Sequence, residues 1–408
     1  MPGLIDSTLR EGLQGVRVEL SPAQQLVVAT GLVKLGIEEL EVGPVGLTQA
    51  AGGEPVDPLA LLIPRLRREA EVRRLAVWCR CVPADIERSL ALAPDVLSLS
   101  IPVSPLQMAS KLGQPATAVL NLVEAALTRA RGLVPCLALG LEDATRAEPD
   151  FLRQMVELAV SHGVDRLRLA DTVGIAAPGE IAELVERVRG YVAAGRAARG
   201  RPAGCATGKP ISIGVHTHND FGLASANAIA ALEAGADWAD VSLLGLGERA
   251  GLARLEEVAA YLALRRDHPY RLERLPEMAR QLAGFCGREI PPWRPVVGRD
   301  VFSCETGLHL AAMQVDPASY EPFAPELVGR RRTLLYGIKA GRRAIARQWE
   351  RCRRAHCPAE QSAPATTAEG PKNSTIPVAL MIRVRQAARD LRRPLTCDEL
   401  QQVFLNYA

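Results

Sequence analysis

Short apolar segments alternate with longer segments of helical period along roughly the first 265 residues of the chain. The apolar segments are rich in Val, Ile and Leu and are bounded by Gly, Pro or charged positions, as buried β-strands are. We therefore expect strands at residues 3–8, 36–42, 74–79, 96–101, 134–140, 166–172, 211–218 and 239–245.

The segments between these strands have the spacing of amphipathic helices. Most of them begin at Pro, Ser or Asp, which are residues that favour the first turn of a helix. Helices are expected at residues 22–35, 57–69, 83–92, 115–131, 149–162, 178–195, 222–234 and 251–265.

Strict alternation of strand and helix predicts a parallel sheet. Eight units in about 260 residues match the size at which such a sheet closes into a (β/α)8 barrel of the TIM type. A doubly wound open sheet is the alternative, but no glycine fingerprint for a dinucleotide follows the first strand. The fold class we predict is α/β, a TIM barrel followed by a smaller α-rich region.

The pattern changes after the barrel, which we assign to residues 1–265. Residues 266–350 are punctuated by Arg and Pro and are expected to form linker helices and a lid-like subdomain. A flexible linker is predicted over residues 351–375, because its later part is rich in Ala, Pro, Ser and Thr. Helical spacing returns in a C-terminal tail at residues 376–408.

Composition places the chain among ordinary soluble proteins. It is 48% hydrophobic and 23% charged, and its net charge of +3 gives no reason to expect a nucleic-acid partner. The 9 Cys residues show no zinc-type CxxC pairs, which suits reduced thiols in the cytoplasm. Asp6 and Arg10 interrupt any apolar run near the start, and no segment approaches a membrane span, so no membrane partner is expected.

Two histidines on the predicted seventh strand are the strongest chemical signal. His216 and His218 are two positions apart, so their imidazoles leave an extended strand on the same face. Near the first strand, Arg10 and Glu11 place a cation beside a carboxylate, and Glu11 is the candidate for a third metal ligand. Taken alone, His216 and His218 could be histidines with ordinary hydrogen-bond partners. Taken alone, Arg10 and Glu11 could be a solvated ion pair. Together, at the carboxyl ends of barrel strands where TIM enzymes place their chemistry, they indicate a metal site.

Several motifs, in order along residues 3–350, resemble those of the DRE-TIM metallolyases, and more narrowly the homocitrate, 2-isopropylmalate and citramalate synthases. These motifs are STLREGLQ, ADTVG, HTHNDFGLA, GLGERAG followed by LEEV, and VFSCETGLH. The segments VWCRC, SIPVSPLQMASKLG and LGLEDATRAEP most resemble homocitrate synthases of the nitrogen-fixation type.

The resemblance implies a metal-dependent condensation. Glu11, His216 and His218 would hold one divalent ion, either Mg, Mn, Fe, Co or Zn. Arg10 would stabilise negative charge on the ketone oxygen of a 2-oxo acid. His309 would act as the base toward the methyl group of acetyl-CoA, with Tyr320 as its hydroxyl partner.

Substrate contacts and assembly also follow from the resemblance. Thr172 is expected to bind the substrate carboxylate, and Arg80 and Ser104 are candidates for a distal carboxylate or for loop packing. Asn219 would support the metal ligands from outside. The region carrying His309 would cover the barrel mouth of a partner subunit, so a homodimer with exchanged C-terminal regions is expected.

The expected reaction joins acetyl-CoA, 2-oxoglutarate and water into homocitrate and CoA. Another 2-oxo acid, as in 2-isopropylmalate or citramalate synthases, is the first alternative, and a metal-binding paralogue without turnover is the second. The sequence departs from the family pattern at Gln25, Leu252, Cys304 and the segment 337–341. These positions leave room for an altered specificity.

Overall fold

The computed structural model describes residues 1–46, 57–197, 210–356 and 376–407. The chain forms two compact units, Met1–Ile290 and Pro291–Ala408. None of the described helices is long and apolar enough to cross a bilayer.

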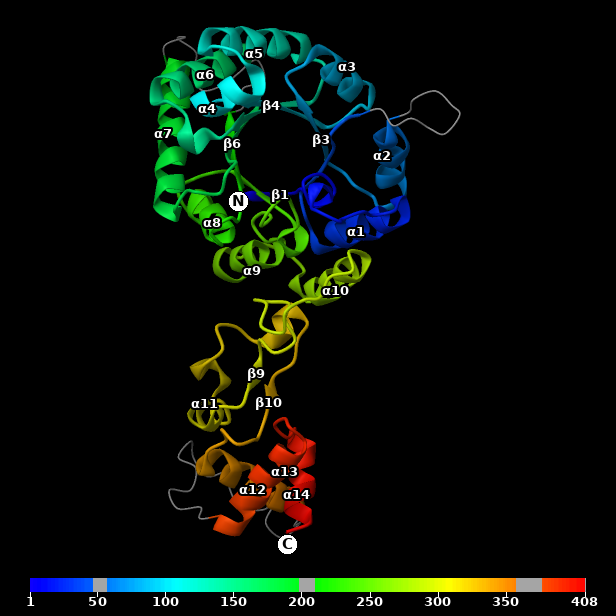
Figure 1. Ribbon diagram of the computed structural model, residues 1–408, viewed down its shortest axis with the longest axis vertical. Coiled ribbons are helices and arrows are strands. Elements are labelled where there is room, and N and C mark those ends of the chain that lie inside the picture. The colour runs from blue at the N-terminus through cyan, green and yellow to red at the C-terminus, as the bar shows by residue number, and fades with distance from the viewer. Residues whose placement is uncertain (47–56, 198–209, 357–375, 408) are drawn as a thin grey trace. The chain divides into compact units, whose positions relative to one another are not determined.

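The first unit is a closed barrel of eight parallel strands, which confirms the predicted fold (Figure 1). Strand β1 pairs with β2 on one side and with β8 on the other, so the sheet has no free edge. The strands are β1 Gly3–Asp6, β2 Glu39–Val42, β3 Leu75–Arg80, β4 Val96–Pro102, β5 Cys136–Glu142, β6 Arg166–Asp171, β7 Ser212–Thr217 and β8 Trp238–Val241.

Helices surround this ring of strands (Figure 1). The start signals act as predicted: Ser21 and Gln24 form a capping box on the first helix, with Pro22 in its first turn. The helices of this unit are α1 Pro22–Leu35, α2 Pro58–Glu69, α3 Pro83–Ala91, α4 Pro105–Gln107, α5 Ala116–Ala130, α6 Pro149–His162, α7 Pro178–Ala197, α8 Ala224–Glu233, α9 Leu255–Arg266 and α10 Leu275–Phe285.

Several boundaries differ from those read from the sequence, and two of them have a clear physical reason. The eighth strand ends at Val241, because Leu243–Gly245 forms a 3₁₀ turn in which Leu244 has a positive φ. The first unit continues past residue 265 to Ile290, since α10 packs on α1, where Met278 lies against Gly31. This close approach leaves no room for a side chain larger than glycine at position 31 without displacing Met278.

The barrel interior is held together by ion pairs as well as by apolar side chains. Near the amino ends of the strands, Arg166 donates to both carboxylate oxygens of Glu39 at 2.7 and 2.9 Å, and its guanidinium lies 4.3 Å from the ring centre of Trp238. One layer further up, Arg168 pairs with Glu41 at 2.5 Å and with Asp240 at 2.9 Å. Breaking a buried pair of this kind typically costs about 3–5 kcal/mol, so these residues fix the strands that carry the site.

In its described residues, the second unit combines a small strand pair with four α-helices. Strand β9 Ser303–Cys304 runs parallel to β10 Thr333–Leu334, and the backbone of Tyr336 bonds in both directions with Leu395. The helices are α11 Gly307–Met313, α12 Arg342–His356, α13 Val378–Asp390 and α14 Cys397–Leu405.

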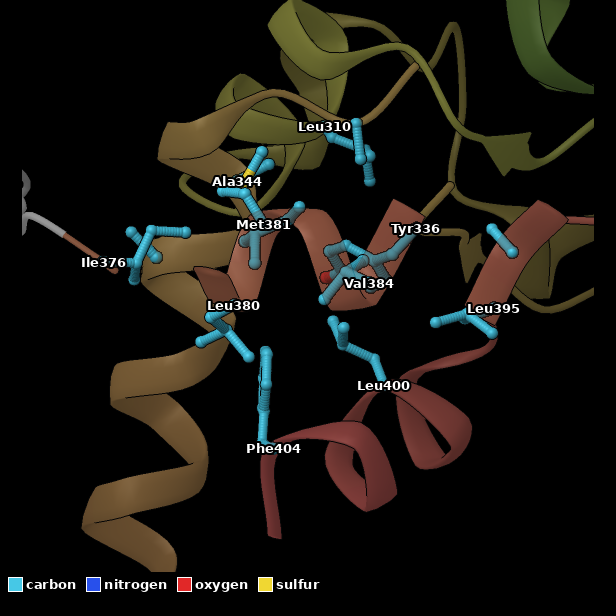
Figure 2. Close-up of a cluster of buried hydrophobic side chains, with 14 of the residues drawn as sticks. Leu310, Tyr336, Ala344, Ile376, Leu380, Met381, Val384, Leu395, Leu400 and Phe404 are labelled. Carbon is cyan, nitrogen blue, oxygen red and sulfur yellow. The ribbon is translucent and has the colours of Figure 1, made fainter. Parts of the chain in front are cut away.

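The C-terminal tail completes the core of this second unit. Figure 2 shows side chains of α13 and α14 pointing into one cluster together with Leu310 of α11. Tyr336 is fully buried there, and its hydroxyl accepts a hydrogen bond from Gln314 at 2.9 Å. Residues 351–356, expected in a linker, extend α12, and the rest of that predicted linker lies outside the described residues.

Candidate active site

Four polar side chains meet where β1 and β7 end. Arg10 and Glu11 lie in the turn that follows β1, and His216 and His218 lie at the end of β7 and just beyond it. Each of the four is at most 5% exposed. The structure therefore brings together, in a buried setting, the residues that the sequence places at two distant strand ends.

The two imidazoles face one another. Their Nε2 atoms are 3.3 Å apart, and the ring centres are 5.0 Å apart. On its other side, His216 Nδ1 lies 2.7 Å from Asp240 Oδ2. With a neutral ring, His216 donates its Nδ1 proton to this carboxylate, so its Nε2 lone pair points toward His218.

Both histidines are uncharged at neutral pH. Burial, followed by the positive charges of Arg10 and Arg168, lowers the pKa of His216 to about 3. Burial, followed by the neighbouring His216, lowers the pKa of His218 to about 2. Neutral imidazoles are the form that binds metal ions.

The histidine pair has the geometry of two ligands of one ion. Two nitrogens bound to a metal at about 2.1 Å, with an angle of about 90–110° between them, lie about 3.0–3.4 Å apart. The observed 3.3 Å falls in this range. The hydrogen bond from His216 to Asp240 adds the outer carboxylate that commonly orients a metal-binding histidine.

Glu11, the third expected ligand, is turned toward Arg10. Its Oε2 atom forms an ion pair with Arg10 Nη1, although the carboxylate is near enough to His216 to oppose the lowering of the pKa of that ring. Within the described ranges, no three His, Cys, Asp or Glu residues are arranged to hold a metal ion. To bind the ion, the Glu11 carboxylate would therefore have to break its ion pair with Arg10.

Arg10 is held on three sides. Its Nε donates to Glu41 at 2.8 Å, its Nη1 pairs with Glu11, and its guanidinium lies 5.3 Å from the centre of the Trp78 ring. Burial alone would raise the pKa of Glu41, but Arg10 and Arg168 lower it below its usual value, so Glu41 stays ionised. These contacts fix the guanidinium in position.

Sequence reasoning missed the residues that support this cluster. Glu41, Arg168 and Asp240 are charged positions inside strands that otherwise read as apolar. That contrast is the signal that could have identified them, because a charged side chain in a strand buried on both faces must point into the barrel beside a partner.

The two hydroxyls expected at the substrate carboxylates meet at Asp143. Thr172 Oγ1 accepts from the backbone N–H of Asp143 at 2.8 Å, which leaves the hydroxyl hydrogen without an acceptor among the described residues. Ser104 Oγ contacts the Asp143 carboxylate and accepts from Gln107 N–H at 3.2 Å. Thr172 is thus available to a ligand, whereas Ser104 caps α4 and positions Asp143.

Arg80 pairs with an acidic residue at the start of the next helix. Its guanidinium donates to Asp85 at 2.7 and 3.3 Å, and its side chain is 66% exposed. Binding a distal substrate carboxylate would require Arg80 to leave Asp85. Lys111 also lies at this rim, where its Nζ donates to Glu142 at 2.7 Å.

Asn219 and Arg249 hold the loops that follow β7 and β8. Asn219 Oδ1 accepts from Ala224 N–H at 3.2 Å, so it caps the start of α8. Arg249 pairs with Asp220 at 2.9 Å and donates to the Thr172 carbonyl at 2.6 Å. Arg249 therefore ties the loop after β8 to the end of β6.

The expected base and its hydroxyl partner lie together in the second unit. The rings of His309 and Tyr320 stack with their centres 4.0 Å apart and their planes at 30°. His309 lies on α11, and Tyr320 follows a short 3₁₀ turn at Pro317–Ser319. Both are exposed, as groups that must reach a substrate from outside their own unit would be.

Asp6 provides a pH test of the buried end of β1. Its Oδ1 accepts from Thr8 N–H at 2.9 Å, and burial raises its pKa to about 7. Because this lies above the unfolded value of about 3.9, the proton on Asp6 stabilises the fold at low pH, and this contribution is lost as pH rises toward 7. As the pH rises from about 5.5 to 7.5, the free energy of unfolding of Asp6→Asn should increase by roughly 2 kcal/mol relative to that of the wild type.

Thermal unfolding across this pH range measures the difference. Asp150→Asn is the control, because the Asp150 side chain is 89% exposed. A constant separation between the Asp6→Asn and wild-type melting temperatures would contradict the expectation.

Comparison with known families accounts for both units. Residues 2–282 match the HMGL-like family, and residues 296–367 match the family described as homocitrate synthase post-HMGL domain-like. Together the two matches span the barrel and most of the second unit.

Individual proteins give the same result. The chain is 32% identical over 403 residues to 2-isopropylmalate synthase 2 of Caldanaerobacter subterraneus subsp. tengcongensis, which covers 98% of this chain and 94% of the relative. It is 34% identical to homocitrate synthase 1 of Nostoc sp., with 84% of each chain covered. The HMG-CoA lyase structure from Brucella melitensis, at 17% identity and a TM-score of 0.57, covers 70% of this chain and 99% of the lyase, and supports the barrel fold.

Proposed function

The chain belongs to the HMGL-like family of DRE-TIM metallolyases, and on that premise we propose that it is a homocitrate synthase. The reaction joins the methyl carbon of acetyl-CoA to the ketone carbon of 2-oxoglutarate. Hydrolysis of the thioester then gives homocitrate and free CoA. The facing histidine pair beside Arg10, buried at the carboxyl ends of β1 and β7, is the observation that carries this proposal.

Members of this family generally use a divalent metal. We assign it to Glu11, His216 and His218, and when bound it would polarise the ketone oxygen of the 2-oxo acid. Arg10, held by Glu41, is placed to stabilise the negative charge that develops on that oxygen. Thr172 is available to donate its hydroxyl hydrogen to the substrate carboxylate.

The carbon–carbon bond needs a carbanion from the thioester. His309 accepts a proton from the acetyl methyl group, and the resulting carbanion attacks the ketone carbon. Histidine is the side chain that most often serves as a general base at neutral pH. Since His309 lies in the second unit, we propose that it serves the barrel of a partner subunit in a cytoplasmic homodimer.

The choice of 2-oxoglutarate rests on cations at the barrel rim and on one relative. A second carboxylate needs a cation, and Arg80 or Lys111 could supply it by leaving Asp85 or Glu142. The Nostoc relative is named a homocitrate synthase, whereas the Caldanaerobacter relative of similar identity is named for 2-isopropylmalate. A shorter or branched oxo acid is therefore the second candidate.

Thiol release from acetyl-CoA, measured with a panel of 2-oxo acids, tests the assignment. We expect kcat/KM for 2-oxoglutarate to exceed that for pyruvate or 2-oxoisovalerate at least about tenfold, because the binding site must supply a partner for the distal carboxylate. A higher value with pyruvate or 2-oxoisovalerate would replace homocitrate by citramalate or 2-isopropylmalate as the product. No release with any acid would contradict the proposed enzyme activity itself.

A further inference from the structure

A basic pocket lies on the second unit, beside the stacked pair of His309 and Tyr320. Its volume is about 880 Å³, within the usual range for small-molecule sites. Residues of α11 and the first turns of α12 form its walls. The contacts proposed above for the 2-oxo acid lie in the barrel and do not use this pocket.

Positive charge dominates the pocket. The pocket is lined by Lys339, Arg342, Arg343 and Arg347, and Asp316 is the only carboxylate among the described residues that line it. Asp316 already accepts a hydrogen bond from the backbone N–H of residue 318 at 3.0 Å. An anionic ligand is therefore favoured over a cationic one.

Two of these cations are free to bind a ligand. Lys339 lies 3.3 Å from Glu305, and Arg347 donates to the carbonyl of Ala311. Arg342 and Arg343 are exposed and have no ion-pair or hydrogen-bond partner in the described part of the chain. Their guanidinium groups can each donate two parallel hydrogen bonds to a phosphate.

The helix that carries these arginines adds to the attraction. Helix α12 is 15 residues long, and its first turn contains no acidic residue. Its amino end borders the pocket, because Gly341, Arg342 and Arg343 are all lining residues. Free backbone N–H groups and the helix dipole favour an anion there. A Cβ on Gly307 would come within 2.4 Å of Gly341 N, so glycine is needed for the two helices to meet here.

One side of the pocket is apolar. Leu308 and Val315 lie seven positions apart on or just after α11, so they share a face, and they are 81% and 48% exposed. Leu310, between them, points into the core of the unit (Figure 2). The ligand should thus combine several negative charges with an apolar arm.

We propose that this pocket binds the phosphates of the 3′-phosphoadenosine diphosphate portion of CoA, with the pantetheine arm lying over Leu308 and Val315. This inference rests on the proposed function, since acetyl-CoA is the substrate assigned there. His309 follows Leu308 on the same helix, so an arm that crosses Leu308 can bring the thioester to the proposed base. A dicarboxylate has too few charges to use four cations.

The test is CoA binding by calorimetry to the full-length protein and to the double variant Arg342→Ala, Arg343→Ala. Both side chains are exposed, so the fold should survive their removal. We expect the dissociation constant for CoA to rise about 30-fold, and that for pantetheine, which lacks the phosphates, to stay within about twofold. Inorganic pyrophosphate should compete with CoA for the wild type.

The matched control is Arg385→Ala, Arg389→Ala, which removes two exposed arginines from α13 of the same unit and should leave CoA affinity unchanged. The pocket assignment is overturned if CoA binds the Arg342, Arg343 variant as tightly as the wild type, or if the wild type does not bind CoA. If the wild type binds pyrophosphate but not CoA, the pocket is a site for free phosphates and the assignment is also overturned. Tight CoA binding without thiol release would refute the proposed activity and leave the pocket standing.

Discussion

Replacing His309 by alanine is expected to lower kcat for thiol release by a factor of about 10³, because the acetyl methyl group then lacks its base. The 2-oxo acid should still bind, since the groups assigned to it lie in the barrel unit. Steady-state thiol release gives kcat, and calorimetry with 2-oxoglutarate gives binding. His309 is exposed, so its removal leaves no cavity in a core.

Two further variants sharpen this expectation. Tyr320→Phe keeps the ring that stacks on His309 and removes only the hydroxyl, so we expect a smaller loss of about tenfold. His162→Ala, on α6, should leave kcat unchanged, because His162 hydrogen-bonds within its own helix. Loss of oxo-acid binding in His309→Ala, or unchanged kcat, would contradict the role proposed for His309.

Arg10→Ala is expected to lower kcat/KM by about 10³, the size of effect seen when a donor to a developing oxyanion is removed. Lysine at this position keeps the charge but cannot contact Glu41 and Glu11 at once as the guanidinium does. The kcat/KM of Arg10→Lys should therefore be about tenfold higher than that of Arg10→Ala. The measurement is thiol release at a series of 2-oxoglutarate concentrations.

Folding must be separated from catalysis in the Arg10 variants. Removing Arg10 leaves the buried Glu41 with Arg168 as its remaining ion-pair partner and Glu11 without its partner, so Arg10→Ala should also melt at a lower temperature. Trp78→Phe keeps an aromatic ring near Arg10 and serves as the structural control. If Arg10→Ala and Arg10→Lys lose activity only in proportion to their unfolded fraction at the assay temperature, Arg10 is structural and the proposed role is wrong.

The barrel could be predicted from the sequence because its signals are local. Strand and helix periods alternate eight times, and proline or serine begins most helices, as at Ser21 and Pro22. The approach of His216 to His218 also follows from local geometry, since residues two apart on a strand share a face. These features need no knowledge of distant contacts.

The features of the site that could not be predicted from the sequence depend on how the chain folds around them. Glu41 and Arg168 are 127 positions apart and meet only because β2 and β6 face the same barrel interior. In the sequence, Arg80 is a candidate for a substrate carboxylate or for loop packing, and its contact with Asp85, on the next helix, is visible only in the fold. Glu11 lies next to Arg10 in sequence, yet its choice between Arg10 and a metal ion depends on which charges surround both in the fold.

Metal dependence of thiol release is the most direct test of the central claim, that Glu11, His216 and His218 form a metal site used in condensation. The protein is treated with a chelator until no metal remains by elemental analysis, and thiol release from acetyl-CoA with 2-oxoglutarate is then measured before and after adding Mg or Mn. We expect activity to fall at least about 100-fold and to return with the metal, but not to return in His218→Ala. Full activity in the metal-free protein would contradict the claim.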